Sequence, residues 1–432
     1  MLNLCANIYW TIFKIRSKSP LMEIYNETKL SNGLTITTEH MPHVESISMG
    51  VYVRTGSRTE NEENSGVAHF LEHMAFKGTD KRTAEDIAAE IEDVGGAINA
   101  YTSRETTAYH LKLLKEDTEL GVDMLSDILQ NPTFLKEEFK REQGVILQEL
   151  AASLDEPEEI VFDNLQKTIY PNSAMGWSIL GNKQSITNMS VAKLKTFMES
   201  YYHPQNMVIS ASGNVNHKDF VALCEKYFNK LKVNNKKAII TPEYHTGVIH
   251  THKDLEQSHI VMCYNAMSSV DPHFYAANIF TSILGGGMAS RLFQEIREKR
   301  GLAYSIYSYL ASYSDCGNFG IYAGTDASQV EETIQVVQEE IERLKNDMTE
   351  HEINRAKIGL IAGLKMSLES TDSRMGRMAK NQFLYGRQMP VEEIVADIEK
   401  ITVDDIKAAA DTMTDKSTLS ISTLGRHAAP QI

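Results

Sequence analysis

The pattern of hydrophobic and polar positions predicts the same succession of elements twice along the chain. Strands are expected where apolar and polar residues alternate, and helices where apolar residues recur every three or four positions. The first half predicts strands within 28–55, helices at 66–77 and 83–94, strands within 97–114, and helices at 117–130 and 134–153. The second half predicts a strand at 258–263, helices at 272–284 and 290–300, strands within 303–323, and helices at 327–345 and 350–368.

This recurrence indicates an internal duplication that is visible in the order of elements rather than in residue identity. A polar segment at 230–250, with two adjacent Asn, a Pro and a Gly, separates the two series. We therefore predict an α+β protein with two homologous domains, each a mostly antiparallel sheet packed with helices. The expected bounds are 24–232 and 246–426, joined by a linker at 233–245.

Composition narrows the classes of protein that the chain can represent. The 432 residues are 42% hydrophobic and 23% charged, as in ordinary globular proteins. The 58 Asp and Glu against 43 Lys and Arg give a net charge of −15. This balance argues against nucleic-acid binding, which needs a basic face, and it permits basic peptides as partners. The composition is also not that of a bundle of membrane-spanning helices.

Cysteine usage bears on the compartment and on the metal. The chain has four cysteines, which are widely spaced and form no CxxC pair: Cys5, Cys224, Cys263 and Cys316. We expect reduced, mostly buried thiols in a cytosol-like compartment. A zinc site built from cysteines is not expected.

The N-terminal residues 1–23 differ from the rest of the chain. Residues 2–13 are mostly apolar and are followed by Lys14, Arg16 and Lys18. The run is too short to span a membrane, and it lacks the leading charge and cleavage site of a secretory signal. Two interpretations stay open: an organelle transit peptide, since no acid precedes Glu23, or translation that starts at Met22. In both, 1–23 is a disordered or mis-started extension outside the fold.

The strongest chemical signal is the sequence His69-Phe70-Leu71-Glu72-His73. On a helix, positions 69 and 73 lie one turn apart on the same face, so two neutral imidazoles can bind one zinc ion. Glu72 lies beside them and can take a proton from a water molecule whose pKa the metal lowers. The motif is the inverted form of the HExxH zinc-peptidase motif. Because HxxEH also arises by chance, the motif alone is only suggestive.

A catalytic zinc ion also needs a third protein ligand. The best candidates lie in REQGVILQEL, where Glu142 and Glu149 are two turns apart on one face of a predicted helix. Glu149 follows His73 by 76 positions. The residues themselves leave both acids open as the third ligand.

The sequences HFLEHMAFKGT at 69–79 and EQGVILQE at 142–149 resemble the pitrilysin family of zinc peptidases. The similarity is greatest to the branch that holds the β-subunit of mitochondrial processing peptidase and its bacterial relatives, and it covers the chain after residue 24. It implies one Zn²⁺ per subunit, Glu149 as the third ligand and Glu142 as a residue that supports the ligands. The implied activity is a metalloendopeptidase acting on short or unfolded peptides. The alternative is a non-catalytic partner subunit, although such subunits have typically lost parts of the zinc motif.

The resemblance also implies a function for three further features of the sequence. Residues 95–102 resemble the edge strand on which a peptide substrate adds as a strand, with Asn99 and Ala100 near the scissile bond. An ordinary strand after a glycine turn is the competing interpretation. Arg297 and Tyr304 match an Arg–Tyr pair seven positions apart. Tyr304 would donate a hydrogen bond to the oxyanion, and Arg297 would anchor the substrate backbone.

The third feature is the acidic pair Glu159 and Asp163, one helical turn apart. It resembles the stretch by which processing peptidases bind arginine in targeting presequences, and a guanidinium suits two such carboxylates. Solvated surface acids are the competing interpretation.

The family's enclosed chamber consists of four domains, whereas this chain supplies two. The resemblance therefore implies a homodimer, or a heterodimer with a related subunit, in which the zinc domain of one copy faces the second domain of the other. It favours the bacterial cytoplasm as the compartment, with the mitochondrial matrix as the alternative.

Overall fold

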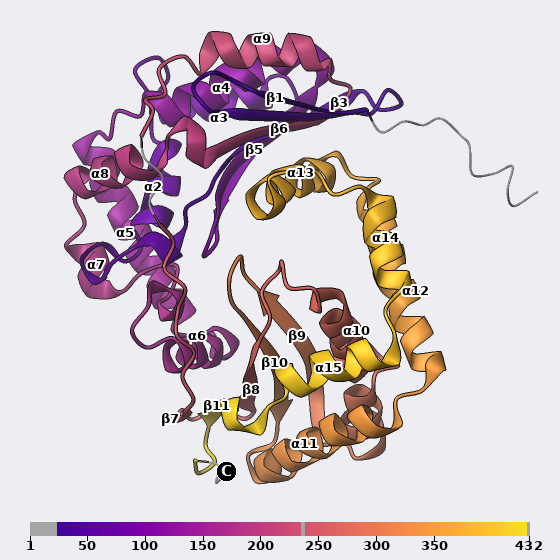
Figure 1. Ribbon diagram of the computed structural model, residues 1–432. Helices are drawn as coiled ribbons and strands as arrows, with labels where there is room; N and C mark the ends of the chain where they lie inside the picture. The colour runs from indigo at the N-terminus through magenta and orange to yellow at the C-terminus, as the bar shows by residue number, and fades with distance from the viewer. Residues whose placement is uncertain (1–23, 235–237, 430–432) are drawn as a thin grey trace, which may run out of the picture.

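The structure is a computed structural model that describes residues 24–234 and 238–429. The expectations for 1–23 lie outside the described residues. The chain forms two sheets, each packed with helices, as Figure 1 shows. The α+β prediction is confirmed.

The first sheet has six strands in the order β1-β2-β6-β3-β5-β4. β2 and β6 are parallel, and all other neighbours are antiparallel. β4 lies at the edge of this sheet and pairs only with β5 among the described strands. The strands are β1 (Ile24–Lys29), β2 (Thr35–His40), β3 (Ser46–Val53), β4 (Ala97–Thr102), β5 (Thr107–Leu114) and β6 (Met207–Gly213).

The second sheet has five strands in the order β7-β11-β8-β10-β9. β7 and β11 are parallel, and the other neighbours are antiparallel. This order and these directions repeat those of β2-β6-β3-β5-β4, so the duplication expected from element order is present in the sheet topology. The strands are β7 (Val248–His252), β8 (Ser258–Ala266), β9 (Ala303–Ser312), β10 (Gly317–Thr325) and β11 (Ser420–Gly425).

The helices predicted from periodicity occur within about one turn of their expected bounds. The first half contains α2 (Val67–Ala75), α3 (Ala84–Glu92), α4 (Thr118–Gln130), α5 (Lys136–Ser153), α6 (Pro157–Ile169), α7 (Lys183–Thr187), α8 (Val191–Tyr201) and α9 (His217–Tyr227). The second half contains α10 (Phe274–Gly285), α11 (Val330–Asp347), α12 (Glu350–Ser367), α13 (Thr371–Tyr385), α14 (Val391–Glu399) and α15 (Val403–Met413). The helix expected at 290–300 is a π-helix, η6 (Phe293–Lys299). Short 3-10 helices are η1 (Ser57–Thr59), η2 (Glu62–Asn64), η3 (Lys115–Asp117), η4 (Ala174–Gly176), η5 (Pro204–Asn206), η7 (Ala327–Gln329) and η8 (Lys416–Thr418).

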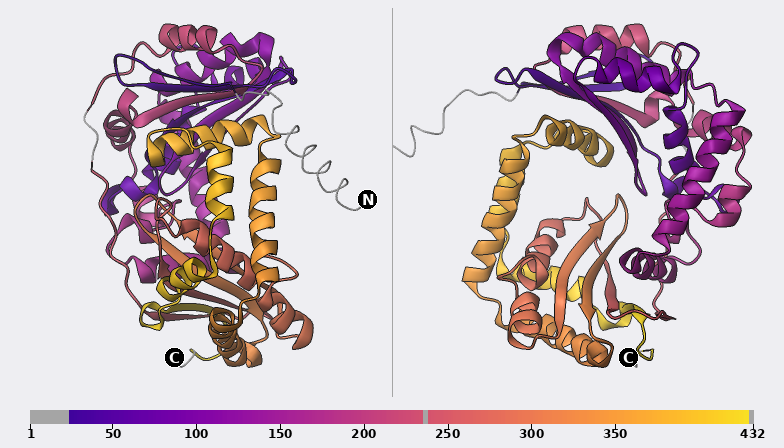
Figure 2. Two further views of the ribbon diagram at one scale, coloured as in Figure 1. Left: turned by 45° about the vertical axis from the view of Figure 1, so that its right-hand side comes forward. Right: turned by 180° about the vertical axis from the view of Figure 1, so that it is seen from behind.

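Each half of the chain sends one helix to the sheet of the other half. Helix α6 packs on β11 and β8, where Val161 and Leu165 join Val261 and Leu424 in one buried cluster. Helix α13 packs on β6 and β3, on the face opposite α4 and α9 (Figure 1). Figure 2 shows α12, α13 and α14 connecting the two halves along one side. Each half therefore has a large buried core of its own, and two smaller buried clusters combine side chains of both halves.

Polar contacts also join the halves. The Arg58 side chain lies 2.6 Å from both Glu105 of the first half and Asp315 of the second. Glu105 accepts hydrogen bonds from the backbone N–H and the hydroxyl of Ser314. The guanidinium of Arg58 is almost fully buried between these two carboxylates, so loss of Arg58 would leave uncompensated negative charge in the interface. No helix among the described residues is long and apolar enough to cross a membrane.

We predict that Leu165→Ala destabilises both halves together. Leu165 is fully buried between α6 and the second sheet, so the cavity should cost about 2–5 kcal/mol in the free energy of unfolding. Urea denaturation checks the magnitude, and hydrogen exchange should show lost protection in β8 and β11 as well as in α6. Lys167→Ala, at an exposed position of the same helix, is the matched control. Loss of protection confined to the first half would contradict the exchanged packing.

Candidate active site

Helix α2 presents both histidines and Glu72 on a short element that is anchored at its start. It follows Gly66, which has a left-handed φ of 87°. A Cβ at Gly66 would lie 2.7 Å from the Leu180 carbonyl oxygen, so this position requires glycine. The apolar side of α2 packs against α5, where the rings of Phe70 and Phe139 stack with centroids 4.8 Å apart.

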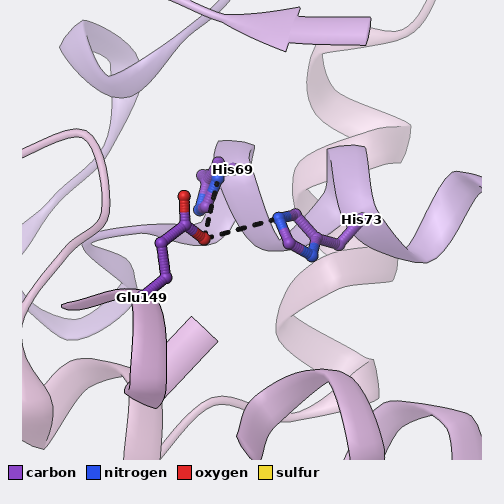
Figure 3. A group of neighbouring side chains, drawn as sticks. All are labelled: His69, His73 and Glu149. Carbon is purple, nitrogen blue, oxygen red and sulfur yellow. Dashed lines mark ion pairs between the residues drawn. The ribbon is translucent and has the colours of Figure 1, made fainter. Parts of the chain in front are cut away.

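The packing of α2 on α5 brings His69, His73 and Glu149 together (Figure 3). Glu149 Oε2 lies 3.7 Å from Nε2 of His69 and 3.7 Å from Nε2 of His73. Among the described residues, this is the one group of three potential ligands with atoms within 4.8 Å of one another. A tetrahedral zinc ion bound at about 2.0–2.1 Å separates its ligand atoms by about 3.3 Å. The two nitrogens and one oxygen therefore fit zinc with small adjustments.

Glu142 supports the site from behind His73. Its Oε2 lies 3.0 Å from His73 Nδ1, and its Oε1 lies 2.9 Å from Lys77 Nζ. A proton on Nδ1 that is donated to Glu142 leaves Nε2 of His73 with a free lone pair for a metal. The buried Glu142 thus fixes the tautomer and orientation of His73, whereas Glu149 belongs to the ligand group.

The protonation state of His69 also suits a ligand. Burial, together with the nearby charge of His73, lowers the pKa of His69 to about 4. His69 is therefore neutral near pH 7, which is the form that binds a metal.

Glu72 lies beside the ligand group and is held by the end of strand β4. Its Oε2 accepts a hydrogen bond of 2.6 Å from the Thr102 hydroxyl. Burial and the negative charge of Glu149 raise the pKa of Glu72, and the Thr102 hydrogen bond and His73 oppose this rise. A raised pKa strengthens a carboxylate as a base at neutral pH. The Thr102 contact also couples this base to the edge strand.

Three supporting residues were not predicted from the sequence: Thr102, Lys77 and Glu60. The buried Glu60 carboxylate accepts the N–H groups of Gly66 at 2.7 Å and Ala68 at 3.0 Å. It caps α2 in place of the side chain that Gly66 lacks. Lys77 follows His73 by four positions, which is a helical spacing that could have indicated its place. Thr102 carries no comparable signal because its partner Glu72 is 30 positions away, and Glu60 carries none because it lies in the irregular segment before α2.

The remaining predicted residues lie on the expected elements without joining the ligand group. Asn99 and Ala100 are on edge strand β4, and the Asn99 side chain accepts the Ala100 N–H at 2.8 Å. The Arg297 guanidinium lies 4.6 Å from the centre of the Tyr304 ring, and the Tyr304 side chain is 74% exposed. Among the described residues, no hydrogen bond, ion pair or ring contact links Arg297 or Tyr304 to the ligand group.

The predicted acidic pair is on the surface of α6. Glu159 and Asp163 are exposed, and neither forms an ion pair with a described residue. Asp163 lines a cavity of about 660 Å³ together with Lys167 and Trp177. The Asp163 carboxylate is hydrogen-bonded to Ser178 and interacts with the charge of Arg104. The role of the two acids stays a prediction.

Comparison with known proteins agrees with this geometry. Residues 35–183 match the family described as insulinase (peptidase family M16), and residues 188–360 match the peptidase M16 inactive domain. A protein of Rickettsia felis named as an uncharacterized zinc protease is 37% identical over 93% of this chain and 97% of its own length. The uncharacterized zinc protease YmxG of Bacillus subtilis is 37% identical over 88% of this chain and 93% of its own length.

Two solved structures share the fold. A peptidase M16 inactive domain from Pseudomonas fluorescens has a TM-score of 0.87 and 22% identity, covering 94% of this chain and 99% of that one. A protease from Helicobacter pylori has a TM-score of 0.86 and 24% identity, and the match covers 93% of this chain and 99% of the Helicobacter pylori chain.

We predict that metal retention separates the ligands from the base. His73→Ala and Glu149→Gln should weaken zinc binding by more than the roughly 10–100-fold typical of losing a supporting residue such as Glu142. Glu72→Gln, a matched substitution beside the same site, should retain zinc. Elemental analysis after dialysis measures the difference. Full zinc in Glu149→Gln together with loss in Glu142→Gln would show that the other acid is the ligand.

Proposed function

The chain belongs to the M16 family of peptidases, and from this premise we propose that it is a zinc-dependent endopeptidase that hydrolyses short or unfolded peptides. The convergence of His69, His73 and Glu149 beside Glu72 carries the proposal. The names of the relatives support zinc as the metal. The second half matches a domain described as inactive, and among its described residues it holds no such ligand group.

Each residue of the candidate site then has a defined role. Zinc, when bound by His69, His73 and Glu149, would activate a water molecule as the nucleophile. Glu72 is the base beside the ligand group, where its carboxylate would accept a proton from the attacking water and deliver it to the amine leaving group. Thr102 orients the Glu72 carboxylate through their 2.6 Å hydrogen bond. Glu142 keeps the metal-facing nitrogen of His73 unprotonated.

Strand β4 is the proposed platform for the peptide. Its free edge offers backbone groups to an extended substrate at Asn99 and Ala100, which gives affinity with little demand on sequence. A substrate that bonds the Ala100 N–H would replace the Asn99 side-chain oxygen as its acceptor. Thr102 ends the same strand and contacts Glu72, so a peptide on β4 would pass close to the base.

Basic peptides are the proposed preference, by analogy with presequences. The exposed carboxylates of Glu159 and Asp163 support this, because they are one turn apart, form no ion pair with a described residue and can accept a guanidinium, although Asp163 is also hydrogen-bonded to Ser178. The bacterial sources of the relatives support the bacterial cytoplasm as the compartment.

The competing hypothesis is a non-catalytic subunit of a processing-peptidase-like complex. It predicts an incomplete site, whereas this chain keeps three ligands, the neighbouring base and the residues that orient both. The enzyme is therefore the favoured function.

A shared active site is the proposed use of the second half. Arg297 and Tyr304 lie against each other on η6 and β9, and the Tyr304 side chain is exposed. No described contact links them to the ligand group of the same chain. A two-fold dimer would place them at the ligand group of the partner, with Tyr304 as oxyanion donor and Arg297 holding the substrate backbone.

We expect Glu72→Gln to lower peptide turnover by at least the roughly 10²–10⁴-fold typical of losing a general base, while the metal stays bound. Hydrolysis of a quenched fluorescent peptide, with and without chelator, measures this. The proposed function is refuted if Glu72→Gln cleaves at the wild-type rate, or if metal-loaded wild type cleaves no unfolded peptide.

Complementation tests the shared site. Glu72→Gln and Tyr304→Phe should each be nearly inactive as homodimers. After subunit exchange, their mixture should regain activity, because one of the two sites in a heterodimer then has both intact parts. A verified heterodimer without activity, or a fully active monomer, would exclude the shared arrangement.

A further inference from the structure

A cavity of about 650 Å³ lies between the two halves, at the end of edge strand β4. Its wall includes Tyr101 and Ser103, the residues on either side of Thr102. Thr102, whose hydroxyl contacts Glu72, lies between these two residues in the chain, so the cavity adjoins the strand that contacts the proposed base. Tyr313 of the second half and Phe383 of α13 add aromatic surface to the same wall. Such a concave, partly apolar space beside a reactive group is suited to part of a substrate.

The charged residues that line this cavity are mostly basic. Its one acid, Glu105, is already paired with Arg58 at 2.6 Å and accepts hydrogen bonds from Ser314. The four basic residues of the wall are Arg54, Arg104, Arg377 and Lys380.

Two of these four cations have a partner in the structure: Arg377 lies 3.5 Å from Glu39, and Arg104 donates a hydrogen bond to the Met175 carbonyl oxygen. The other two have no neutralising partner among the described residues. Arg54 and Lys380 take part in no ion pair or side-chain hydrogen bond between described residues. The chain as a whole carries a net charge of −15, whereas the wall of this cavity carries an excess of positive charge. Such a wall favours the binding of an anionic ligand.

We propose that this cavity binds a carboxylate of the peptide substrate through Arg54 and Lys380, with an adjoining apolar side chain against the aromatic wall. The inference rests on the proposed peptidase function and specifies its substrate class. Alternate side chains of a peptide added to β4 point to the face that carries Tyr101, and so toward the cavity. The carboxylate belongs either to an Asp or Glu side chain or to the free C-terminus of a short peptide.

This preference differs from the one proposed for Glu159 and Asp163. Those acids suit a basic part of the substrate, whereas the cavity suits a carboxylate close to the scissile bond. The two sites predict a peptide with opposite charges at separate positions.

Peptide binding to the inactive Glu72→Gln protein tests the proposal. One series of labelled peptides places Glu or Gln at each position around the cleaved bond, and a second carries a free or an amidated C-terminus. We expect an affinity about tenfold higher for the carboxylate form, at one side-chain position or at the C-terminus, as for a charge-assisted hydrogen bond. The two series identify the source of the carboxylate. The same preference should appear in kcat/KM of the active protein.

The double variant Arg54→Gln with Lys380→Gln should reduce the ratio between carboxylate and neutral peptides to about one. Lys218→Gln, at an exposed position of α9, makes a single charge change away from the cavity and should keep the ratio. In unsubstituted protein, added salt should also lower the ratio, which provides a test that needs no cavity variant.

The outcomes separate this inference from the proposed function. Cleavage of all peptides with a ratio near one would overturn the carboxylate site and leave the peptidase. A carboxylate preference that persists in the double variant would likewise overturn it. A preference in binding that depends on Arg54 and Lys380, without cleavage of any peptide by metal-loaded protein, would support the site and overturn the peptidase. Absence of both binding and cleavage would overturn both.

Discussion

The packing of α2 against α5 is the contact on which the candidate site depends. Phe70 and Phe139 stack on the apolar side of this contact, and His73, Glu142 and Glu149 meet on its polar side. The seven-residue spacing of the two acids directs both toward α2, one to support a histidine and the other to join the ligand group. Two stretches that are far apart in sequence thereby form one group of potential metal ligands.

The exchange of helices attaches this site to the second half. Helix α5 carries Glu149 and continues through 154–156 into α6, which is buried against the second sheet. The turn after β4 is held from the other side, because Glu105 contacts Arg58 and Ser314. Helix α5 and edge strand β4 are thus both fixed by contacts between the halves, and the basic cavity lies in the same interface.

Features that depend on local spacing were predictable from the sequence. Helical periodicity located α2 and α5, and the positions of His69, His73 and Glu149 within them follow from 3.6 residues per turn. The partner of α6 was not predictable, because Val161 and Leu165 show that one face is buried without showing which sheet covers it. The Thr102–Glu72 contact depends on tertiary packing in the same way, whereas the Glu60–Gly66 contact depends on the conformation of the irregular segment before α2. The roles of Arg297, Tyr304, Asn99, Ala100, Glu159 and Asp163 require a bound substrate, so they stay predictions.

X-ray absorption at the zinc edge tests the central claim most directly, because it reports the atoms around the metal in the intact protein. The account predicts two imidazole nitrogens and only oxygen as the remaining ligands, at about 2.0–2.1 Å. The described cysteines do not belong to the ligand group. A sulfur ligand at about 2.3 Å, or purified protein that binds no zinc, would contradict the account.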